Sequence, residues 1–200
     1  MGGEAVVPDP ARAFPERLLG AVQEALQVMP PPEYSSTGCI ERSNSREWPA
    51  IDVGGESVSI PYRVYNPVVR QDAALSSDGR LVLACLYSRH NDGRVRQAQL
   101  SRILASDDEA VAPFVLQLLG EYVVEIAQDV LRFAELELPT RPTLKAAFES
   151  FARLNPSFVR LTQERAVSYW AAYYCREYLW FKDYPAAIAL RLLVSSDGEA

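Results

Sequence analysis

The stretch from Ser106 to Leu136 constrains the fold of this chain more than any other part of the sequence. Its apolar residues recur at the i, i+3, i+4, i+7 spacing of an α-helix and cover most of the circumference, which is typical of a helix buried inside a bundle. Ser106 and Glu109 form a capping box that marks the start of this helix. Pro113 predicts a kink or a restart in the first turns, and Gly120 predicts a close crossing by another element. The apolar residues of the stretch are Val111, Phe114, Val115, Leu118, Leu119, Tyr122, Val123, Ile126, Ala127, Val130, Phe133 and Ala134.

Length and composition favour one domain built around this helix. The chain has 200 residues, of which 48% are hydrophobic, and this is enough for a sizeable core. We predict a single helical domain over residues 13–194, with flexible ends at 1–12 and 195–200. The formal net charge of −6 argues against a general binder of nucleic acid or of anionic membranes. No apolar run reaches the ~18 residues of a membrane span, so no membrane segment is expected.

The remaining periodicities predict a mainly α fold. Helical patterns cover residues 15–28, 78–89, 94–104, 143–154, 158–181 and 185–194. Apolar residues alternate on either side of Gly54-Gly55, which predicts a β-hairpin near residues 50–60 whose extended backbone continues to about residue 65. A long loop without periodicity precedes the hairpin, at residues 30–49. The expected fold is an irregular helical bundle of about six or seven helices with one small hairpin.

Cysteine and histidine usage excludes the common metal and disulfide frameworks. Cys39, Cys85 and Cys175 are widely spaced and form no CxxC pair, so neither a disulfide network nor a zinc site is predicted, and a reducing cytoplasm is the expected location. His90 is the single histidine, which excludes multi-histidine metal sites. No phosphate-binding loop of the G-x-x-x-x-G-K-[ST] or G-x-G-x-x-G type is present. We therefore expect no metal and no cofactor.

The start of the helix predicted at 94–104 carries a known pattern. Asp92, Val95, Arg96 and Ala98 resemble the helix signature of HEAT-type repeats. The resemblance implies that the Asp and the Arg join adjacent helical units while the Val and the Ala pack between them. No second copy follows at a period of about forty residues, so the resemblance implies HEAT-like helical hairpins within the bundle and not a full solenoid.

The turn between Arg89 and Arg96 is the first candidate binding site. Arg89, Arg94 and Arg96 surround it, His90 lies within it, and the N–H groups at the start of the following helix favour an anion. A phosphate or an acidic partner is the expected ligand. Two structural roles are the alternatives: Arg96 as the joining arginine of the HEAT-like pair, and His90 as a favourable charge at a helix C-terminus.

Aromatic residues in the helix predicted at 158–181 form the second candidate site. Trp170 and Tyr174 are its candidate binding residues, because rings spread around a helix cannot all enter the core and an exposed group of rings indicates a partner surface. Glu121, Glu125 and Asp129 follow one another at i+4 spacing. They are interpreted as a solvated helix edge, or alternatively as carboxylates that converge on a cleft and bind a divalent cation or act as acid and base.

The function predicted from these observations is a non-enzymatic helical module that binds or scaffolds another protein. The lack of a recognisable catalytic motif favours it. The alternative is an enzyme, or a nucleic-acid-processing protein, on a HEAT-like scaffold with a carboxylate-lined cleft. A concave pocket with ionisable residues of perturbed pKa would favour the enzyme, and an exposed apolar patch would favour the module.

Overall fold

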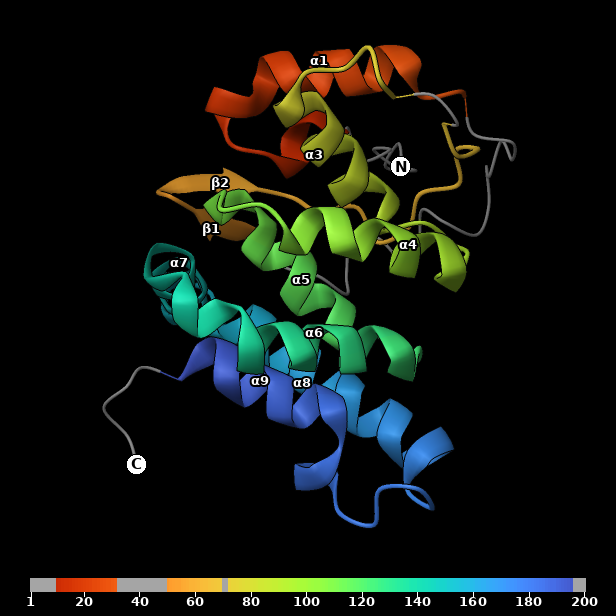
Figure 1. Cartoon of the computed structure of the whole chain (residues 1–200), viewed down its shortest axis with the longest axis vertical. Coiled ribbons are helices and arrows are strands. Elements are labelled where there is room, and N and C mark those ends of the chain that lie inside the picture. Colours follow the sequence, from red (N-terminus) through yellow and green to blue (C-terminus); the bar gives the residue numbers. More distant parts are fainter. Residues whose placement is uncertain (1–9, 32–49, 70–71, 196–200) are drawn as a thin grey trace, which may run out of the picture. The chain divides into compact units, whose positions relative to one another are not determined.

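The computed structural model describes residues 10–31, 50–69 and 72–195, and Figure 1 shows their arrangement into helices and one hairpin. The fold is mainly helical with a small antiparallel hairpin, as expected. The chain divides into two compact units, residues 1–102 and 103–200, which are described separately below. Within the described residues, no helix combines the length and the hydropathy that crossing a bilayer requires.

Some predicted segments fall outside the described residues. These are residues 1–9 of the predicted flexible N-terminus, 32–49 of the predicted loop and 196–200 of the predicted tail. The described end of the N-terminal segment forms a short 3-10 helix, η1 (Pro10–Ala13).

The first unit is built on the packing of α1 (Leu19–Val28) against α3 (Ser77–Tyr87). A single turn, η2 (Glu16–Leu18), leads into α1, and α4 (Gly93–Leu104) follows α3. Ser76 caps α3, because its hydroxyl accepts a hydrogen bond from Gly79 N at 3.0 Å. The carboxylate of Glu24 accepts from both the hydroxyl and the backbone N–H of Ser76, at 2.7 and 3.0 Å, and these bonds lower the pKa of Glu24. The cap thus ties α1 to the start of α3.

The predicted hairpin is present as β1 (Ile51–Val53) and β2 (Glu56–Val58). Gly54 and Gly55 form the turn with φ of 63° and 89°, values that glycine adopts at little steric cost. The register pairs Ile51 with Val58, and both side chains are buried together with Val53. Alternation around two glycines was therefore sufficient to predict this element.

The second unit is a bundle of five α-helices among the described residues. They are α5 (Ala112–Leu119), α6 (Val124–Leu136), α7 (Pro142–Leu154), α8 (Pro156–Tyr169) and α9 (Pro185–Val194). The short turns η3 (Glu109–Val111), η4 (Leu138–Thr140), η5 (Trp170–Tyr174) and η6 (Phe181–Asp183) connect or extend them. Within this bundle, α6 and α9 pack against each other most extensively, and Figure 1 shows the two helices side by side. The two helices bury Ile126, Val130 and Phe133 from α6 and Leu193 from α9.

The prediction of one continuous helix from residue 106 to 136 is wrong. The first predicted turn is the 3-10 turn η3, α5 begins at Ala112 with Pro113 in its first turn, and a second interruption separates α5 from α6 at residues 120–123. Gly120 ends α5, and α8 crosses it closely: a Cβ at this position would lie 3.4 Å from both the Arg165 Cβ and the Thr162 carbonyl oxygen. The crossing predicted from Gly120 is confirmed. Arg165 Nε then donates to the Gly120 carbonyl at 3.2 Å, so a side chain satisfies a group that the broken helix leaves open.

The helix predicted at 158–181 is also shorter than expected. Regular α structure ends at Tyr169, η5 continues it as a π-helical turn, and the chain then loops back before α9. The loop brings the rings of Tyr178 and Phe181 around Tyr184, and a straight helix would hold these rings apart. Packing of aromatic side chains around Tyr184 thus favours a loop where the last turns of the helix were predicted.

Arg141, which follows α6, is hydrogen-bonded to the segment that precedes η3 and α5. Arg141 donates from Nη1 to the Leu104 carbonyl at 2.5 Å, from Nη2 to the Ser106 carbonyl, and from Nε to the Asp107 carboxylate at 2.7 Å. Its guanidinium carbon also lies 5.6 Å from the centre of the Phe133 ring. The planar fork of an arginine can serve three acceptors at once, and lysine cannot reproduce this geometry.

We expect Arg141→Ala to lower the free energy of unfolding by about 2 kcal/mol, since hydrogen bonds from a charged group are worth about 1.5–3 kcal/mol. Urea denaturation followed by circular dichroism measures the change. Arg132→Ala is the matched control, because Arg132 is exposed and its ion pair with Asp129 at 3.4 Å lies on the surface; it should change stability by less than about 0.5 kcal/mol. Equal effects of the two substitutions would contradict this role of Arg141.

Candidate functional site

The arginines of the predicted anion site are mostly occupied by backbone carbonyls. Arg89 is fully buried and donates from Nη2 to the Tyr62 carbonyl at 3.1 Å and from Nε towards the Pro61 carbonyl at 3.4 Å. Arg96 is also fully buried and donates from Nη1 to the carbonyls of His90 and Asn91, at 2.7 and 3.0 Å. Both guanidinium groups therefore hold the turn and the preceding extended segment in place.

Backbone pairing strengthens the same connection. Val64 N donates to the Arg89 carbonyl at 2.8 Å, and Asn91 N donates to the Val64 carbonyl at 3.0 Å. This forms a parallel bridge between Val64 and His90. The turn after α3 is thus fastened to residues 61–64 by main-chain and arginine hydrogen bonds together.

His90 and Arg94 are the two predicted residues of this turn with accessible side chains. The Nδ1 atom of His90 accepts from Asp92 N at 3.0 Å, which leaves the proton of the neutral ring on Nε2. Arg94 is exposed, and its backbone N–H donates to the Asp92 carboxylate at 2.8 Å. The Asp92 carboxylate therefore occupies the start of α4, where an external anion was expected. These contacts favour the structural reading of the turn.

The three carboxylates at i+4 spacing do not share one helix. Glu121 lies between α5 and α6 and is 2% exposed, whereas Glu125 and Asp129 lie on α6, exposed and half-buried respectively. Asp129 pairs with Arg132 at 3.4 Å. None of the three lines either of the two cavities of the second unit described below. No group of three or more metal-ligating side chains is present within the described ranges.

The predicted aromatic residues Trp170 and Tyr174 lie in η5, and both are half-buried. Trp170 Nε1 donates to the Tyr178 carbonyl at 2.8 Å, which holds the loop after η5. Tyr174 Oη donates to the Tyr122 carbonyl at 2.6 Å, which holds the segment before α6. A π-helical turn changes the direction in which successive side chains point and is frequent at functional positions. Here it aims the two rings at two different backbone segments.

Tyr184 is the buried centre of this aromatic group. Its ring centre lies 5.6 Å from Tyr174, 5.5 Å from Tyr178 and 6.3 Å from Phe181. Its side chain is fully buried, and its hydroxyl has no hydrogen-bond partner in the described part of the chain. Burial raises the pKa of the Tyr184 phenol well above its ordinary range. The ring contacts around Tyr184 therefore restrict the movement of the segments that carry the exposed rings. We call this group of rings the rigid support.

Four large side chains on the segments that carry this group face solvent: Tyr122 lies before α6, Tyr173 lies in η5, and Leu179 and Trp180 lie in the loop after η5. Tyr122 is 45% exposed, Tyr173 68%, Leu179 75% and Trp180 67%. We call these four residues the aromatic surface. Tyr122 and Tyr173 connect to the group through Tyr169, whose ring centre lies 6.1 Å from the first and 6.3 Å from the second. Sequence reasoning selected Trp170 and Tyr174, whose side chains are half-buried, as the binding residues of this segment. It missed Leu179 and Trp180 because the loop that exposes them was predicted as helix, and it missed Tyr122 because that residue was assigned to the buried apolar stripe.

Comparison with known proteins adds no relative from which a function could be transferred. No family model, curated protein or solved structure matches the chain. The HEAT resemblance of residues 92–98 therefore stays a prediction, and the functional argument depends on the geometry of this molecule.

Proposed function

We propose that the protein is a non-enzymatic helical module that binds another protein through the aromatic surface. The observation that carries the proposal is the exposure of Tyr122, Tyr173, Leu179 and Trp180 on a rigid support. Exposed apolar patches on folded proteins usually mark interaction sites, and Tyr and Trp are the residues most enriched among those that dominate binding energy.

Rigidity of the support adds to the argument. The hydrogen bonds of Trp170 and Tyr174 and the ring contacts of Tyr184 fix the loop that carries Leu179 and Trp180. A surface that is ordered before binding loses less conformational entropy when it binds. The proposal also includes HEAT-like packing of α4. In it, α4 belongs to the scaffold, and the partner contacts the aromatic surface.

A cytoplasmic location also belongs to this proposal. Cys175 is exposed and forms no disulfide within the part of the chain that the structure describes. An exposed thiol on an interaction module suits a reducing compartment, where it stays unpaired.

The test compares partner capture by variants of the protein in extract of its native cell. Wild-type bait, a Tyr173→Ser plus Trp180→Ser bait, and a Leu136→Ser plus Leu154→Ser control bait are analysed by quantitative mass spectrometry. The control removes two exposed leucines, 67% and 50% accessible, from the same unit at a different place. A partner should be retained by the wild type and the control and reduced about tenfold or more by the aromatic variant, since truncating a dominant ring costs ≥ ~2 kcal/mol. Equal capture by all three baits, with unchanged melting, would contradict the proposal.

A further inference from the structure

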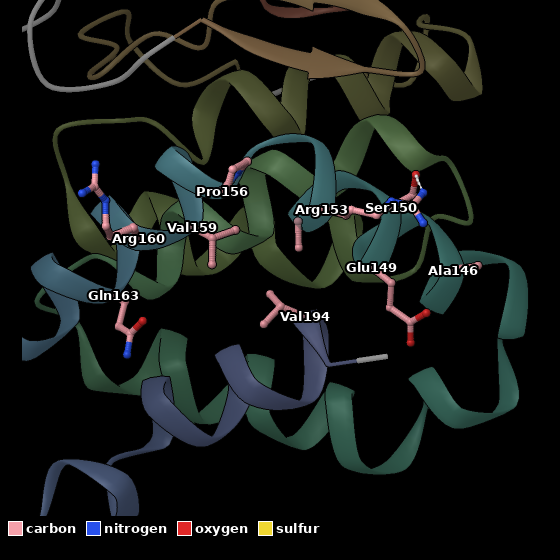
Figure 2. Close-up of a pocket in the computed structure, with 10 residues that line it drawn as sticks. Ala146, Glu149, Ser150, Arg153, Pro156, Val159, Arg160, Gln163 and Val194 are labelled. Carbon is pink, nitrogen blue, oxygen red and sulfur yellow. Dashed lines mark hydrogen bonds between the residues drawn. The ribbon is translucent and has the colours of Figure 1, made fainter. Parts of the chain in front are cut away.

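A groove on the second unit is lined by α7, α8 and the end of α9, as Figure 2 shows. Its volume is about 740 Å³, within the range of about 300–1,000 Å³ that is usual for small-molecule sites. Both α7 and α8 contribute residues at i, i+3, i+4 and i+7 spacing, such as Pro156, Val159, Arg160 and Gln163 on α8, whereas α9 contributes Val194 alone. The groove is therefore made by whole faces of helices and not by one irregular loop.

The middle of the groove is apolar, while Glu149, Ser150, Arg153, Arg160 and Gln163 add polar side chains to its lining. Val159 and Val194 lie at its middle, opposite each other in Figure 2, and Ala146 lies at one end. A second cavity of about 340 Å³ shares Val159 and Val194 and adds Phe181 and Leu190. The two cavities adjoin at Val159, Gln163 and Val194, which line both, and we call the two together the channel.

The charges along the channel are unevenly distributed. Arg160 and Gln163 lie at the end opposite Ala146 and Glu149 in Figure 2, and the second cavity adds Lys182 and Arg191 beside Gln163. At the other end, Glu149 lies 3.8 Å from the ammonium group of Lys145. One end of the channel is thus basic, whereas the other holds both a carboxylate paired with Lys145 and the guanidinium of Arg153, which donates to the Ser150 hydroxyl at 3.2 Å.

The three cations at the basic end are Arg160, Lys182 and Arg191, and all three side chains are exposed. The side chains of Arg160, Lys182 and Arg191 make no hydrogen bond and no ion pair with any residue in the described part of the chain. This is notable in a protein of net charge −6, whose acids outnumber its bases. Three exposed cations beside the apolar middle of the groove favour an occupant with a negative head and an apolar body.

We propose that the groove binds a single-chain anionic amphiphile of the fatty-acid type. Its head lies among Arg160, Lys182 and Arg191, and its hydrocarbon chain lies on Val159 and Val194 towards Ala146. A bare anion would leave the apolar middle of the groove in contact with water.

Isothermal titration calorimetry with laurate, below its micelle concentration, tests the basic end. Arg160→Gln plus Arg191→Gln should raise the Kd for laurate at least tenfold, because both replaced side chains are exposed cations of the channel. Arg132→Gln plus Arg176→Gln is the matched control, since it removes the same charge from the same unit outside the channel and should change Kd less than twofold. Equal losses in the two variants, or no binding of laurate by the wild type at millimolar concentration, would overturn the proposal.

Three further probes test which part of the ligand is recognised. Dodecyltrimethylammonium has the same chain with the opposite charge, and butyrate has the same head with almost no chain; both should bind at least tenfold more weakly than laurate. Val159→Ser should also weaken laurate binding at least threefold while leaving the melting temperature within two degrees of the control variant. Binding of butyrate as strong as that of laurate would show a simple anion site. Co-sedimentation with anionic phospholipid vesicles, without binding of free laurate, would show a membrane surface. Either result would overturn the proposal.

Discussion

Replacing Ile126 by alanine should lower the free energy of unfolding by roughly 2–5 kcal/mol, the largest effect we expect from a single substitution in this chain. Ile126 is fully buried on α6, the helix with the most extensive packing against α9. Removing its three side-chain carbons loses hydrophobic transfer energy and leaves a cavity that the surrounding helices fill only in part. Leu119→Ala should have a similar effect, since Leu119 is fully buried at the end of α5.

Chemical denaturation of the wild type and both variants measures this effect. Leu136→Ala is the control on the same helix, because Leu136 is 67% exposed and its truncation should change stability by less than about 0.5 kcal/mol. A loss below about 0.5 kcal/mol for both Ile126→Ala and Leu119→Ala would mean that this face is not core, and the bundle described for the second unit would be wrong.

The second large effect is a loss of stability that we expect from substitution of Arg96 but not from substitution of the nearby Arg94. Arg96→Ala should destabilise the protein by about 3 kcal/mol, because the side chain is fully buried and its loss leaves two carbonyls, those of His90 and Asn91, without their charged donor. Arg94→Ala should change stability by less than about 0.5 kcal/mol, since its side chain is exposed.

This comparison also decides between the two interpretations of the arginine turn. Melting temperature and phosphate binding are measured on each single variant. A structural turn predicts a lower melting temperature for Arg96→Ala alone and no phosphate binding that depends on Arg94. If phosphate binding to the wild type is instead lost in Arg94→Ala, with melting unchanged, the turn is an anion site after all. Unchanged melting of Arg96→Ala would contradict the structural role.

The sequence could have predicted that Arg96 is buried and Arg94 exposed, although residue type alone does not distinguish the two. Arg96 precedes Leu100 and Ile103 by four and seven positions, so all three lie on one face of α4, and all three are buried. Arg94 lies two residues earlier and therefore on a different face. Helical periodicity applied to charged residues would have separated a buried arginine from an exposed one.

The local sequence determined the hairpin, the starts of three helices and most of the buried positions of the apolar stripe. Gly54-Gly55 required a tight turn, and the alternation around it produced the hairpin between β1 and β2. Pro142, Pro156 and Pro185 lie in the first turns of α7, α8 and α9, where a proline lacks no needed donor. The apolar stripe from Val111 to Ala134 correctly indicated burial except at Tyr122, which is 45% exposed, and Val123, which is half-buried, and both lie in the break between α5 and α6.

Tertiary structure decided what depends on contacts between distant residues. The break at Gly120 follows from the crossing of α8, forty-odd positions later, which supplies Thr162 and Arg165 as neighbours. The π-helical turn at Trp170–Tyr174 and the loop after it follow from the packing of rings around Tyr184. The channel between Ala146, Val159 and Val194 exists only where faces of three helices meet. Periodicity shows that a face is apolar, but the partner of that face is set by how the whole chain minimises its exposed apolar surface, and a local pattern does not contain that information.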